Sequence, residues 1–314
     1  MAMVPPTPRV LVCGSINRDL MVRTSRLPSP GQTQTAHGME EVSGGKGANQ
    51  AVAAVRLGAE VCMLGCVGND GIAATLKNNL ARENIDTQWI RSVPGPSGIA
   101  IVSVDDAGEN SILVVPGANG QLSPTHIDDA LEAFEWADWI VLQLEIPIDT
   151  VKHAIAIAKR IGKRIVLNPA PAPVRFDNEL YHVDLLCPNQ TEAEAILGIT
   201  IKDIDSARAA AIALCQRGAK QVVITLGSQG AIVCDGIDDI THWIPSVAVD
   251  AVDTTAAGDA FIGAMVTRLG LGDPLLTAAT YAASAAAHAV TIPGAQPSLP
   301  NHEEVLEILD PCRS

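Results

Sequence analysis

The 314-residue sequence has few aromatic residues and few basic ones. Aromatic side chains make up 3% of the chain although 47% of it is hydrophobic, so the apolar content comes from Ala, Val, Ile and Leu. Lys and Arg number 21 against 35 Asp and Glu, which gives a formal net charge of −14 at pH 7. Nucleic acids and anionic membranes attract basic surfaces. We therefore expect neither as a partner.

Long hydrophobic runs and an export signal are also missing. No run approaches the ~18–20 apolar residues of a membrane-spanning helix. The start, Met-Ala-Met-Val-Pro-Pro-Thr-Pro, lacks a basic region followed by an apolar stretch. The cysteines form no Cys-x-x-Cys pair and lie mostly in apolar runs. We expect a soluble chain in the reducing cytoplasm. The seven cysteines are Cys13, Cys62, Cys66, Cys187, Cys215, Cys234 and Cys312.

Several familiar catalytic motifs are absent. The sequence holds no Gly-x-Ser-x-Gly elbow, and the first apolar run is followed by Cys13-Gly14-Ser15-Ile16 instead of Gly-x-Gly-x-x-Gly. Its histidines lack the spacing of zinc ligands. These absences argue against a hydrolase, a dinucleotide-binding enzyme and a zinc enzyme.

Short β-branched runs alternate with helical patterns along the chain. This alternation predicts an α/β fold with a central, mainly parallel sheet flanked by helices. The expected buried strands are 9–14, 60–67, 139–144, 164–168, 184–187, 221–225 and 231–234, and helical patterns cover 48–57, 71–84, 148–161 and 274–290.

Two stretches break this alternation. Residues 19–42 and 97–115 have the period-two pattern and the Pro, Gly and Asp turns of antiparallel strands. They form either ordinary edge hairpins or a small antiparallel β lid over a ligand at the carboxyl edge of the main sheet. Because no repeat or long linker interrupts the chain, we expect one α/β domain, 1–314, with lid segments at about 17–43 and 97–116.

A glycine cluster, Gly44-Gly45-Lys46-Gly47-Ala48-Asn49-Gln50, opens an expected helix. It is not a P-loop, because Glu40 and Gly47 stand where that motif needs Gly and Ser or Thr. Glycines let a ligand approach the backbone closely, and Lys46 and Asn49 can bond to hydroxyls. The cluster favours a polyhydroxyl ligand, with a plain turn as the alternative.

Small residues from position 251 lead into a helix that reaches about residue 269. Amides at such a helix start can stabilise the charge on a transferring phosphoryl group. Asp259, in the first turn, either complements the helix dipole or accepts a proton from an attacking hydroxyl. The pattern leaves both interpretations open.

More polar residues follow the other expected strands. Asn17 and Asp19 come after the first strand, and Glu145 follows strand 139–144. Each alone is as typical of a cap or turn. Because the carboxyl ends of parallel strands meet at one sheet edge, these residues and the candidates above predict a polar cluster that suits a sugar.

Two further loops offer polar groups at the same edge. Glu192, in Asn189-Gln190-Thr191-Glu192, can bind Mg²⁺ through water, whereas a helix cap at Thr191 is the alternative. The run Thr225-Leu226-Gly227-Ser228-Gln229-Gly230 suits the phosphates or sugar of a nucleotide, but it is equally typical of a hairpin turn.

Taken together, these segments resemble the carbohydrate kinases of the PfkB type over about residues 10–300, and their shared order and spacing make the match specific. The pieces are Gly14-Ser-Ile-Asn17-x-Asp19, Gly44-Gly-Lys-Gly-Ala-Asn-Gln50, Gln143-Leu-Glu145, Asn168-Pro-Ala-Pro-Ala172, Pro188-Asn-x-Thr-Glu-Ala-Glu194, Thr225-Leu-Gly-Ser228, Ala251-Val-Asp-Thr-Thr-Ala-Ala-Gly-Asp259 and Gly294-Ala-Gln-Pro-Ser298.

The resemblance implies transfer of the γ-phosphoryl group of ATP to the 5-hydroxyl of D-ribose, which gives D-ribose 5-phosphate and ADP. It implies that Asp259 is the base and that the amides of Ala256, Ala257 and Gly258 form an anion hole. It assigns sugar binding to Asn17, Asp19, Gly45, Lys46, Asn49, Glu145 and Asp259, and nucleotide binding to Asn189, Thr225, Gly227, Gly230, Gly258 and Ala283.

The resemblance also implies two cations and a homodimer joined through the lid. Glu192 would orient hydrated Mg²⁺. The positions that match an activating monovalent cation, K⁺, are Asp253, Thr255, Ala289, Gly294 and Ser298.

Two departures from the family pattern qualify these implications. Ile292-Pro293 stand where relatives often carry basic residues, which predicts a changed cation affinity. Ala283-Ser284 stand where relatives place His or Asn against adenine, which predicts looser base selectivity. A kinase for another pentose or a nucleoside, and a sugar-binding regulator without catalysis, are the alternative functions.

Overall fold

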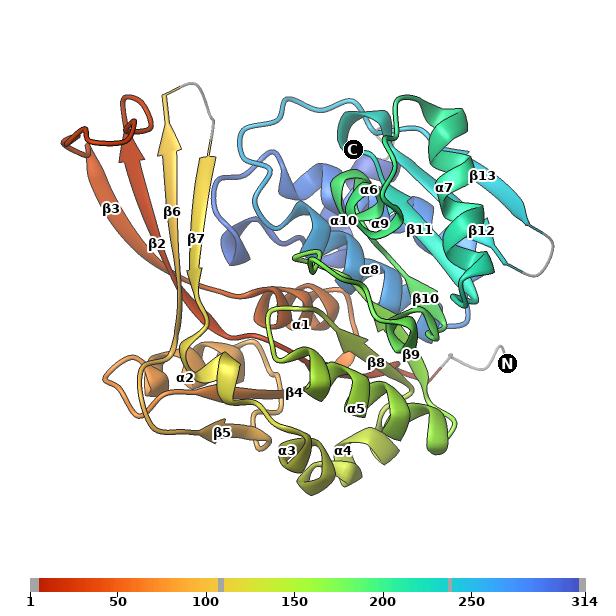
Figure 1. Ribbon diagram of the computed structural model, residues 1–314, viewed down its shortest axis with the longest axis horizontal. Helices are drawn as coiled ribbons and strands as arrows, with labels where there is room; N and C mark the ends of the chain where they lie inside the picture. The colour runs from red at the N-terminus through yellow and green to blue at the C-terminus, as the bar shows by residue number, and fades with distance from the viewer. Residues whose placement is uncertain (1–5, 107–109, 237–238, 311–314) are drawn as a thin grey trace.

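The computed structural model describes residues 6–106, 110–236 and 239–310. Within these residues a nine-stranded sheet runs in the order β13-β12-β11-β10-β9-β8-β1-β4-β5 (Figure 1). Neighbouring strands in the series β11-β10-β9-β8-β1-β4-β5 pair in parallel. Strands β12 and β13 add antiparallel strands at one edge. The strands are β1 (Arg9–Cys13), β4 (Glu60–Val67), β5 (Ile90–Ser92), β8 (Trp139–Leu142), β9 (Arg164–Leu167), β10 (Leu185–Leu186), β11 (Gln221–Thr225), β12 (Ala231–Asp235) and β13 (Ile240–Ile244).

Helices cover both faces of this sheet, so its central strands are apolar on both sides. In β1, Val10 and Val12 pack into one layer, whereas Leu11 and Cys13 pack into the other. The first layer contains α1 (Lys46–Arg56), α2 (Ala73–Arg82), α8 (Ala257–Gly270), α9 (Leu275–Ala289) and α10 (His302–Leu309). The second contains α3 (Pro124–Asp129), α4 (Leu131–Trp136), α5 (Ile148–Arg160), α6 (Gln190–Leu197) and α7 (Ile204–Gln216). Short 3₁₀ helices are η1 (Gly117–Gln121), η2 (Asn178–Tyr181), η3 (Gly227–Gln229) and η4 (Gln296–Ser298).

The structure confirms the predicted α/β class and each expected buried strand, although some strands are shorter. The strand expected at 184–187 is reduced to Leu185–Leu186, for example. The sequence analysis missed β5 and β13. Strand β5 has only three residues, and β13 is largely exposed, so neither carries the apolar run that identifies a buried strand.

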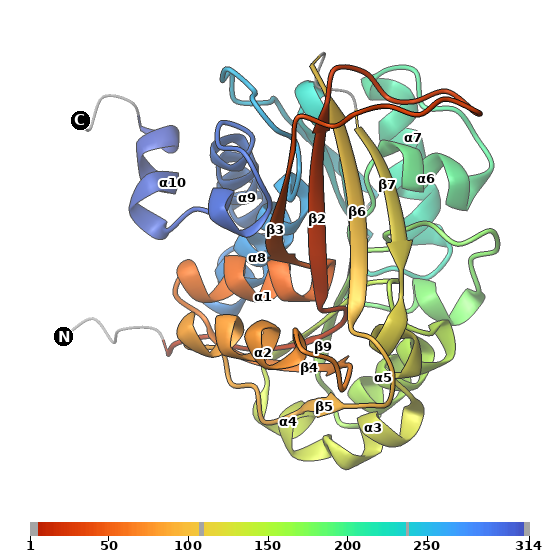
Figure 2. The ribbon, with the colours of Figure 1, turned by 90° about the vertical axis from the view of Figure 1, so that its left-hand side faces the viewer.

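The two irregular stretches form a separate four-stranded sheet in the order β3-β2-β6-β7, seen face on in Figure 2. Its outer pairs are antiparallel as expected, but the middle pair β2–β6 is parallel. The reason is that β2 follows β1 along the chain and β6 follows β5. Because β1 and β5 run in the same direction in the large sheet, the chain leaves both at the same edge and enters the small sheet in the same direction. The strands are β2 (Asn17–Thr24), β3 (Gly38–Gly44), β6 (Gly98–Asp105) and β7 (Asn110–Val115).

The described cysteines are free thiols and, except for half-buried Cys215, lie in the core; Cys312 is outside the described residues. In the part of the chain that the structure describes, no helix is both long and apolar enough to cross a bilayer.

Candidate active site

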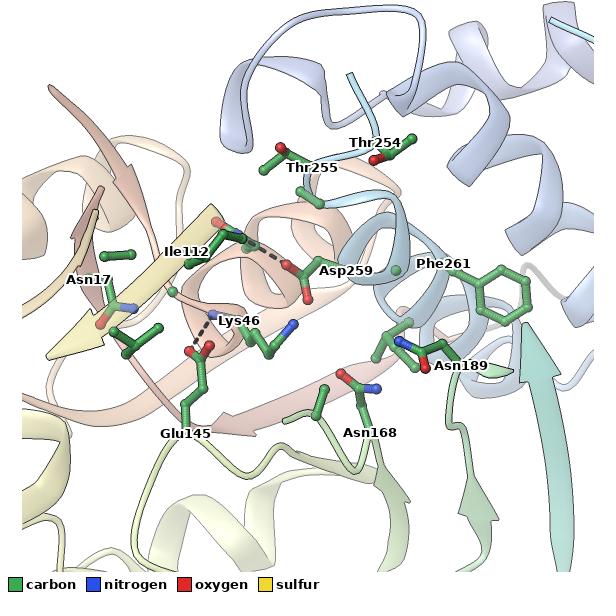
Figure 3. A pocket seen from close by; sticks show the side chains of 18 of the residues that line it. Asn17, Lys46, Ile112, Glu145, Asn168, Asn189, Thr254, Thr255, Asp259 and Phe261 are labelled. Carbon is green, nitrogen blue, oxygen red and sulfur yellow. Dashed lines mark hydrogen bonds between the residues drawn. The ribbon is translucent and has the colours of Figure 1, made fainter. Parts of the chain in front are cut away.

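A cavity of about 290 Å³ lies between the carboxyl edge of the large sheet and the small sheet (Figure 3). Strand β2, the start of α1, the loop after β8 and the first turn of α8 all contribute polar side chains to it. These elements are far apart in sequence, so the fold assembles the predicted polar cluster. The predicted sugar-binding residues that line the cavity are Asn17, Asp19, Gly45, Lys46, Asn49, Glu145 and Asp259.

The start of α1 brings Glu145 into the cavity wall. Gly45 has φ +89°, and a Cβ atom there would lie 2.8 Å from the backbone nitrogen of Asn17, so this position requires glycine. The turn directs the amide of Lys46 to Glu145 Oε2 at 3.2 Å. Ser15 Oγ donates to the same carboxylate oxygen at 2.6 Å. Two donors therefore fix the Glu145 carboxylate.

Asn17 is oriented by a residue that the sequence analysis did not select. Asn119, in η1, is 1% exposed and donates from Nδ2 to Asn17 Oδ1 at 2.7 Å. Its own Oδ1 accepts from the amide of Ile16 at 2.9 Å. These bonds leave the side-chain nitrogen of Asn17, Nδ2, facing the cavity (Figure 3). No local motif marks Asn119, because its role depends on η1 meeting β2.

Asp259 lies at the third position of α8 and is 5% exposed. Its carboxylate does not cap its own helix but reaches across to α1. Oδ2 accepts a hydrogen bond from Asn49 Nδ2 at 3.0 Å, and Oδ1 accepts one from Gln50 Nε2 at 2.9 Å. This geometry favours a carboxylate held for chemistry in the cavity over one that serves the helix end.

The charges in the cavity shift one another. Burial raises the pKa of Asp259 above its ordinary value, although Lys46 and the bonds from Asn49 and Gln50 partly oppose this. Burial, together with Glu145 and Asp259, raises the pKa of Asp19 to about 7. Figure 3 shows the Lys46 side chain extending between Glu145 and Asp259.

Lys46 stays charged in this acidic cluster. Burial alone would lower its pKa, but the carboxylates of Asp259, Glu145, Glu192 and Asp19 outweigh that cost and raise the pKa above its ordinary value. One ammonium group therefore faces several carboxylates, and it stabilises their charged forms.

Two buried acceptor oxygens in the cavity lack a partner. Among the described residues, Asp19 Oδ1 and Asn49 Oδ1 have no hydrogen-bond donor. An unsatisfied buried oxygen costs about 1–3 kcal/mol. Ligand hydroxyl groups can donate to both, so the cavity is prepared for a polyhydroxyl compound.

The first turn of α8 presents backbone amides at the same place. Ala256 caps the helix with φ +61°, a left-handed conformation that costs an alanine about 1–2 kcal/mol. The first amides of a helix have no intrahelical acceptor, although the Ala257 amide makes a long 3.4 Å contact with the carbonyl of Thr254. Of the three residues predicted to form the anion hole, Ala256 and Gly258 line this cavity, whereas Ala257 lines an adjoining cavity.

A second cavity of about 380 Å³ adjoins the first and shares Thr225, Thr254, Gly258 and Phe261 with it. Its remaining wall is mostly apolar, and the sequence analysis missed Val247, Val249, Ala286 and Val290 there because no motif marks them. The predicted nucleotide residues in this wall are Thr225, Gly227, Gly230, Gly258 and Ala283.

Asn189 and Glu192 line the first cavity and also cap α6. Asn189 Oδ1 accepts from the Glu192 amide, and Glu192 Oε2 accepts from the Asn189 amide, both at 2.8 Å. Asn189 is therefore the N-cap, and the alternative that placed the cap at Thr191 was wrong: Thr191 Oγ1 donates to Asn189 Oδ1. Burial raises the pKa of Glu192, partly opposed by the Asn189 amide and Lys46.

Two of the segments expected to hold a monovalent cation lie side by side. Asp253 accepts from the amides of Thr255 at 2.9 Å and Gly294 at 2.8 Å. Burial raises the pKa of Asp253, but these bonds outweigh it and hold the pKa below its ordinary value. The carbonyl of Val290, next to Ala289, accepts from the Asp253 amide.

Ser298, the remaining predicted cation residue, is fully buried, and its hydroxyl donates to the carbonyl of Ala295 at 2.8 Å. Across residues 6–106, 110–236 and 239–310, no group of three or more His, Cys, Asp and Glu is arranged to hold a metal ion. Carbonyl and hydroxyl oxygens beside Asp253 suit a monovalent cation, and the single carboxylate of Glu192 suits Mg²⁺ that keeps its waters.

The sequence profile of the pfkB family carbohydrate kinases matches residues 7–302. A relative from Haemophilus influenzae named ribokinase is 42% identical, over 95% of this chain and 97% of its own length. One from Salmonella typhi named deoxyribokinase is 39% identical, over 96% and 98%. The structure of an Arabidopsis thaliana ribokinase complexed with ribose and ATP aligns with a TM-score of 0.88, at 31% identity, over 97% of this chain and 99% of that one.

With its α/β fold, polar cavity and adjoining apolar cavity, the molecule has the architecture of a small-molecule phosphotransferase. The chain belongs to the pfkB family of carbohydrate kinases.

Proposed function

We propose that the protein is an ATP-dependent kinase that phosphorylates the 5-hydroxyl of D-ribose and releases D-ribose 5-phosphate and ADP. The observation that carries this proposal is the pair of unsatisfied acceptors, Asp19 Oδ1 and Asn49 Oδ1, in a cavity beside the amides that open α8. The ribokinases similar to this chain support ribose as the sugar.

The polar wall holds the sugar, and the small sheet covers it. Hydroxyl groups donate to the oxygens of Asp19, Asn49 and Glu145 and accept from the amide of Asn17 and the ammonium of Lys46. Apart from Asn17 and Asp19 on β2, the small sheet contributes only aliphatic side chains to the cavity, which favours a free sugar over a nucleoside that needs a stacking surface. These aliphatic residues are Ala100, Val102, Ile112 and Val114.

Asp259 acts as the base. Each of its oxygens accepts one hydrogen bond from α1 and keeps lone pairs for a further proton. The 5-hydroxyl gives its proton to Asp259 as its oxygen bonds to the γ-phosphorus, and the bond from that phosphorus to the β,γ-bridging oxygen breaks, so that ADP leaves. Amides of Ala256, Ala257 and Gly258 stabilise the transferring phosphoryl group.

The nucleotide occupies the second cavity, with its base against the apolar wall and its phosphates toward the shared residues Thr225 and Gly258. Ala283 in this wall offers no side-chain donor or acceptor, which supports loose base selectivity. Asn189 lies at the first cavity, so it faces the phosphates and not the base.

Glu192 holds Mg²⁺ through water, and the bound ion supplies neutralisation of phosphate charge. Asp253 and oxygens of Thr255, Ala289, Gly294 and Ser298 would hold K⁺. The bonds from Thr255 and Gly294 to Asp253 support this assignment, because they keep the two chain segments together.

The small sheet also joins two copies of the chain. Its edge strand β7 carries four successive exposed aliphatic residues, of which Leu113 is 66% exposed. An edge strand with exposed apolar side chains is a pairing surface. The single-domain organisation and the cytoplasmic location stay predictions.

The experiment that tests this function compares ATP consumption with D-ribose, 2-deoxy-D-ribose, D-fructose and adenosine, with Mg²⁺ and with K⁺ or Na⁺. We expect turnover that depends on ribose and rises with K⁺. Preference for 2-deoxy-D-ribose, the sugar suggested by the relative named deoxyribokinase, would keep the mechanism and overturn the substrate. Ribose binding without turnover would indicate a regulator.

A further inference from the structure

A chain of two glutamines lies behind Asp259, outside the polar wall of the cavity. Gln50, on α1, is 1% exposed and donates from Nε2 to Asp259 Oδ1 at 2.9 Å. The same nitrogen donates to Asn168 Oδ1 at 3.2 Å. Gln143, which follows β8 and is fully buried, donates from Nε2 to Gln50 Oε1 at 2.6 Å.

The orientation of both amides follows from the carboxylate at the end of the chain. An ionised Asp259 can only accept, so Gln50 must turn its nitrogen toward it and its oxygen toward Gln143. Gln143 must then present its own nitrogen. This arrangement leaves Gln143 Oε1 without a partner among the described residues, which is a cost that a bond serving stability alone would not explain.

The backbone makes room for this arrangement. A Cβ atom at Gly14 would lie 1.9 Å from Gln143 Oε1 and 2.9 Å from the Cα of Gly47. The residue after β1 is therefore small enough for Gln143 to reach α1. The bond from Gln143 to Gln50 therefore connects the end of β8 with α1, and Gln50 connects α1 with Asp259.

We propose that Gln50 is a positioning residue for the base Asp259, and that Gln143 acts through Gln50 by fixing the direction of its amide. The inference rests on the proposed function of Asp259. Asn49 holds Oδ2, and Gln50 holds Oδ1, so the two neighbours on α1 fix the plane of the carboxylate against rotation.

The charged groups that interact with Asp259 come from several elements: Lys46 from α1, Asp19 from β2, Glu145 from the loop after β8 and Glu192 from α6. Of these, Lys46 lowers the pKa of Asp259 and Glu145 raises it, and the bond from Gln50 is a further lowering influence. Removing that bond therefore raises the pKa of Asp259, while the charged neighbours stay in place.

The test uses Gln50→Met, Gln143→Met and the double variant, because methionine is neutral and similar in length. We expect Gln50→Met to lower kcat by about 10–100-fold, the loss of one hydrogen bond to a charged group. KM for ATP should change little. The acid limb of the rate profile should move up by about one pH unit, since the base then protonates at higher pH.

Gln143→Met should change the same quantities in the same direction but less. If Gln143 acts only through Gln50, the double variant should match Gln50→Met alone. Tyr181→Phe is the matched control, because it removes another hydrogen bond of a buried side chain, from Arg217 Nη1 to the Tyr181 hydroxyl at 3.0 Å, and η2 precedes β10 at the sheet edge opposite the cavity. That control should lower Tm and leave the pH profile unchanged.

The pKa of Asp259 is also measured without turnover, by ¹³C NMR titration of aspartate-labelled protein, with Asp259→Asn identifying the signal. We expect it to rise in both glutamine variants. An unmoved titration, or effects of the two variants that multiply, overturns the proposal. A wild type that fails to phosphorylate ribose refutes the proposed function instead, and the titration still decides the role of Gln50.

Discussion

Asn49 donates a hydrogen bond from Nδ2 to Asp259 Oδ2 at 3.0 Å, although 210 positions separate the two residues in the sequence. The bond exists because α1 and α8 pack side by side in one helical layer and both begin at the cavity. One helix supplies the groups that bind a sugar, and the other supplies a carboxylate and a row of amides. Their contact is therefore the relationship on which catalysis depends.

Asp259→Asn should lower kcat by about 10²–10⁴-fold, because the amide cannot accept the proton of the attacking hydroxyl. Affinity for ribose should stay within a few-fold, since the other polar residues of the cavity are unchanged. Turnover assays and calorimetric titration with ribose measure the two effects. Turnover close to that of the wild type would remove Asp259 as the base.

Glu145→Ala should weaken ribose binding by about 1–3 kcal/mol, because it removes a fixed acceptor from the cavity wall. The effect should appear mainly in KM for ribose. The control is Glu132→Ala, which removes an exposed carboxylate on α4 and should change nothing. If ribose affinity is the same in both variants, Glu145 does not belong to the site.

Asp19→Asn should stabilise the free protein at high pH. The pKa of Asp19 is raised to about 7 in the folded protein, against about 3.9 in the unfolded chain. The charged form of Asp19 therefore lowers the free energy of unfolding. This loss is complete above pH 7 and absent below about pH 4, and it amounts to about 1.4 kcal/mol for each unit by which the two pKa values differ. In thermal melting from pH 4 to 8, the Tm of Asp19→Asn should exceed that of the wild type by an amount that grows with pH. The variant should also bind ribose more weakly than the wild type.

An advantage for Asp19→Asn that is constant across this pH range would contradict the assignment. The burial of Asp19 beside Glu145 and Asp259 would then not be the source of its cost.

Ala256→Gly should not lower Tm and should preserve kcat. Glycine adopts φ +61° without strain, and the amide that faces the cavity belongs to the backbone. Ala156→Gly is the matched control, since this alanine is exposed in the interior of α5 and the change should cost about 1 kcal/mol. If both variants lose the same stability, the strain assigned to Ala256 is absent.

Leu113→Lys should convert the proposed dimer into a monomer at micromolar concentration, as measured by sedimentation, because it places a charge on the edge strand β7. Val174→Lys, which changes an exposed valine elsewhere, should leave the assembly unchanged. A wild type that sediments as a monomer would refute the dimer.

The sequence alone predicted much of the candidate site, because its residues lie in short local patterns. Helix starts at Lys46 and Ala257 follow from small residues before apolar helices, and parallel strands bring such starts to one sheet edge. All the predicted sugar residues line one cavity for this reason. Their chemical roles remain proposals that the experiments above decide.

The groups that orient those residues could not be predicted from the sequence. Asn119 lies in no motif, and Gln50 and Gln143 lie in motifs that assigned them no role. Each matters only through a partner brought close by the fold. The same holds for the cap of α6, where Asn189 and Glu192 bond to each other while facing the cavity. Whether a polar residue is a cap, a ligand or both depends on what lies across from it.

By itself, the sequence determined the α/β class, the buried strands and the helices α1, α2, α5, α8 and α9, since hydrophobic period and small residues act over a few neighbouring positions. Only the tertiary structure decided the parallel pairing of β2 with β6, the strain at Ala256 and the hydrogen bonds that hold Asp259. Those features depend on which distant segments meet, and the free energy of burying polar groups requires each of them to find a partner there.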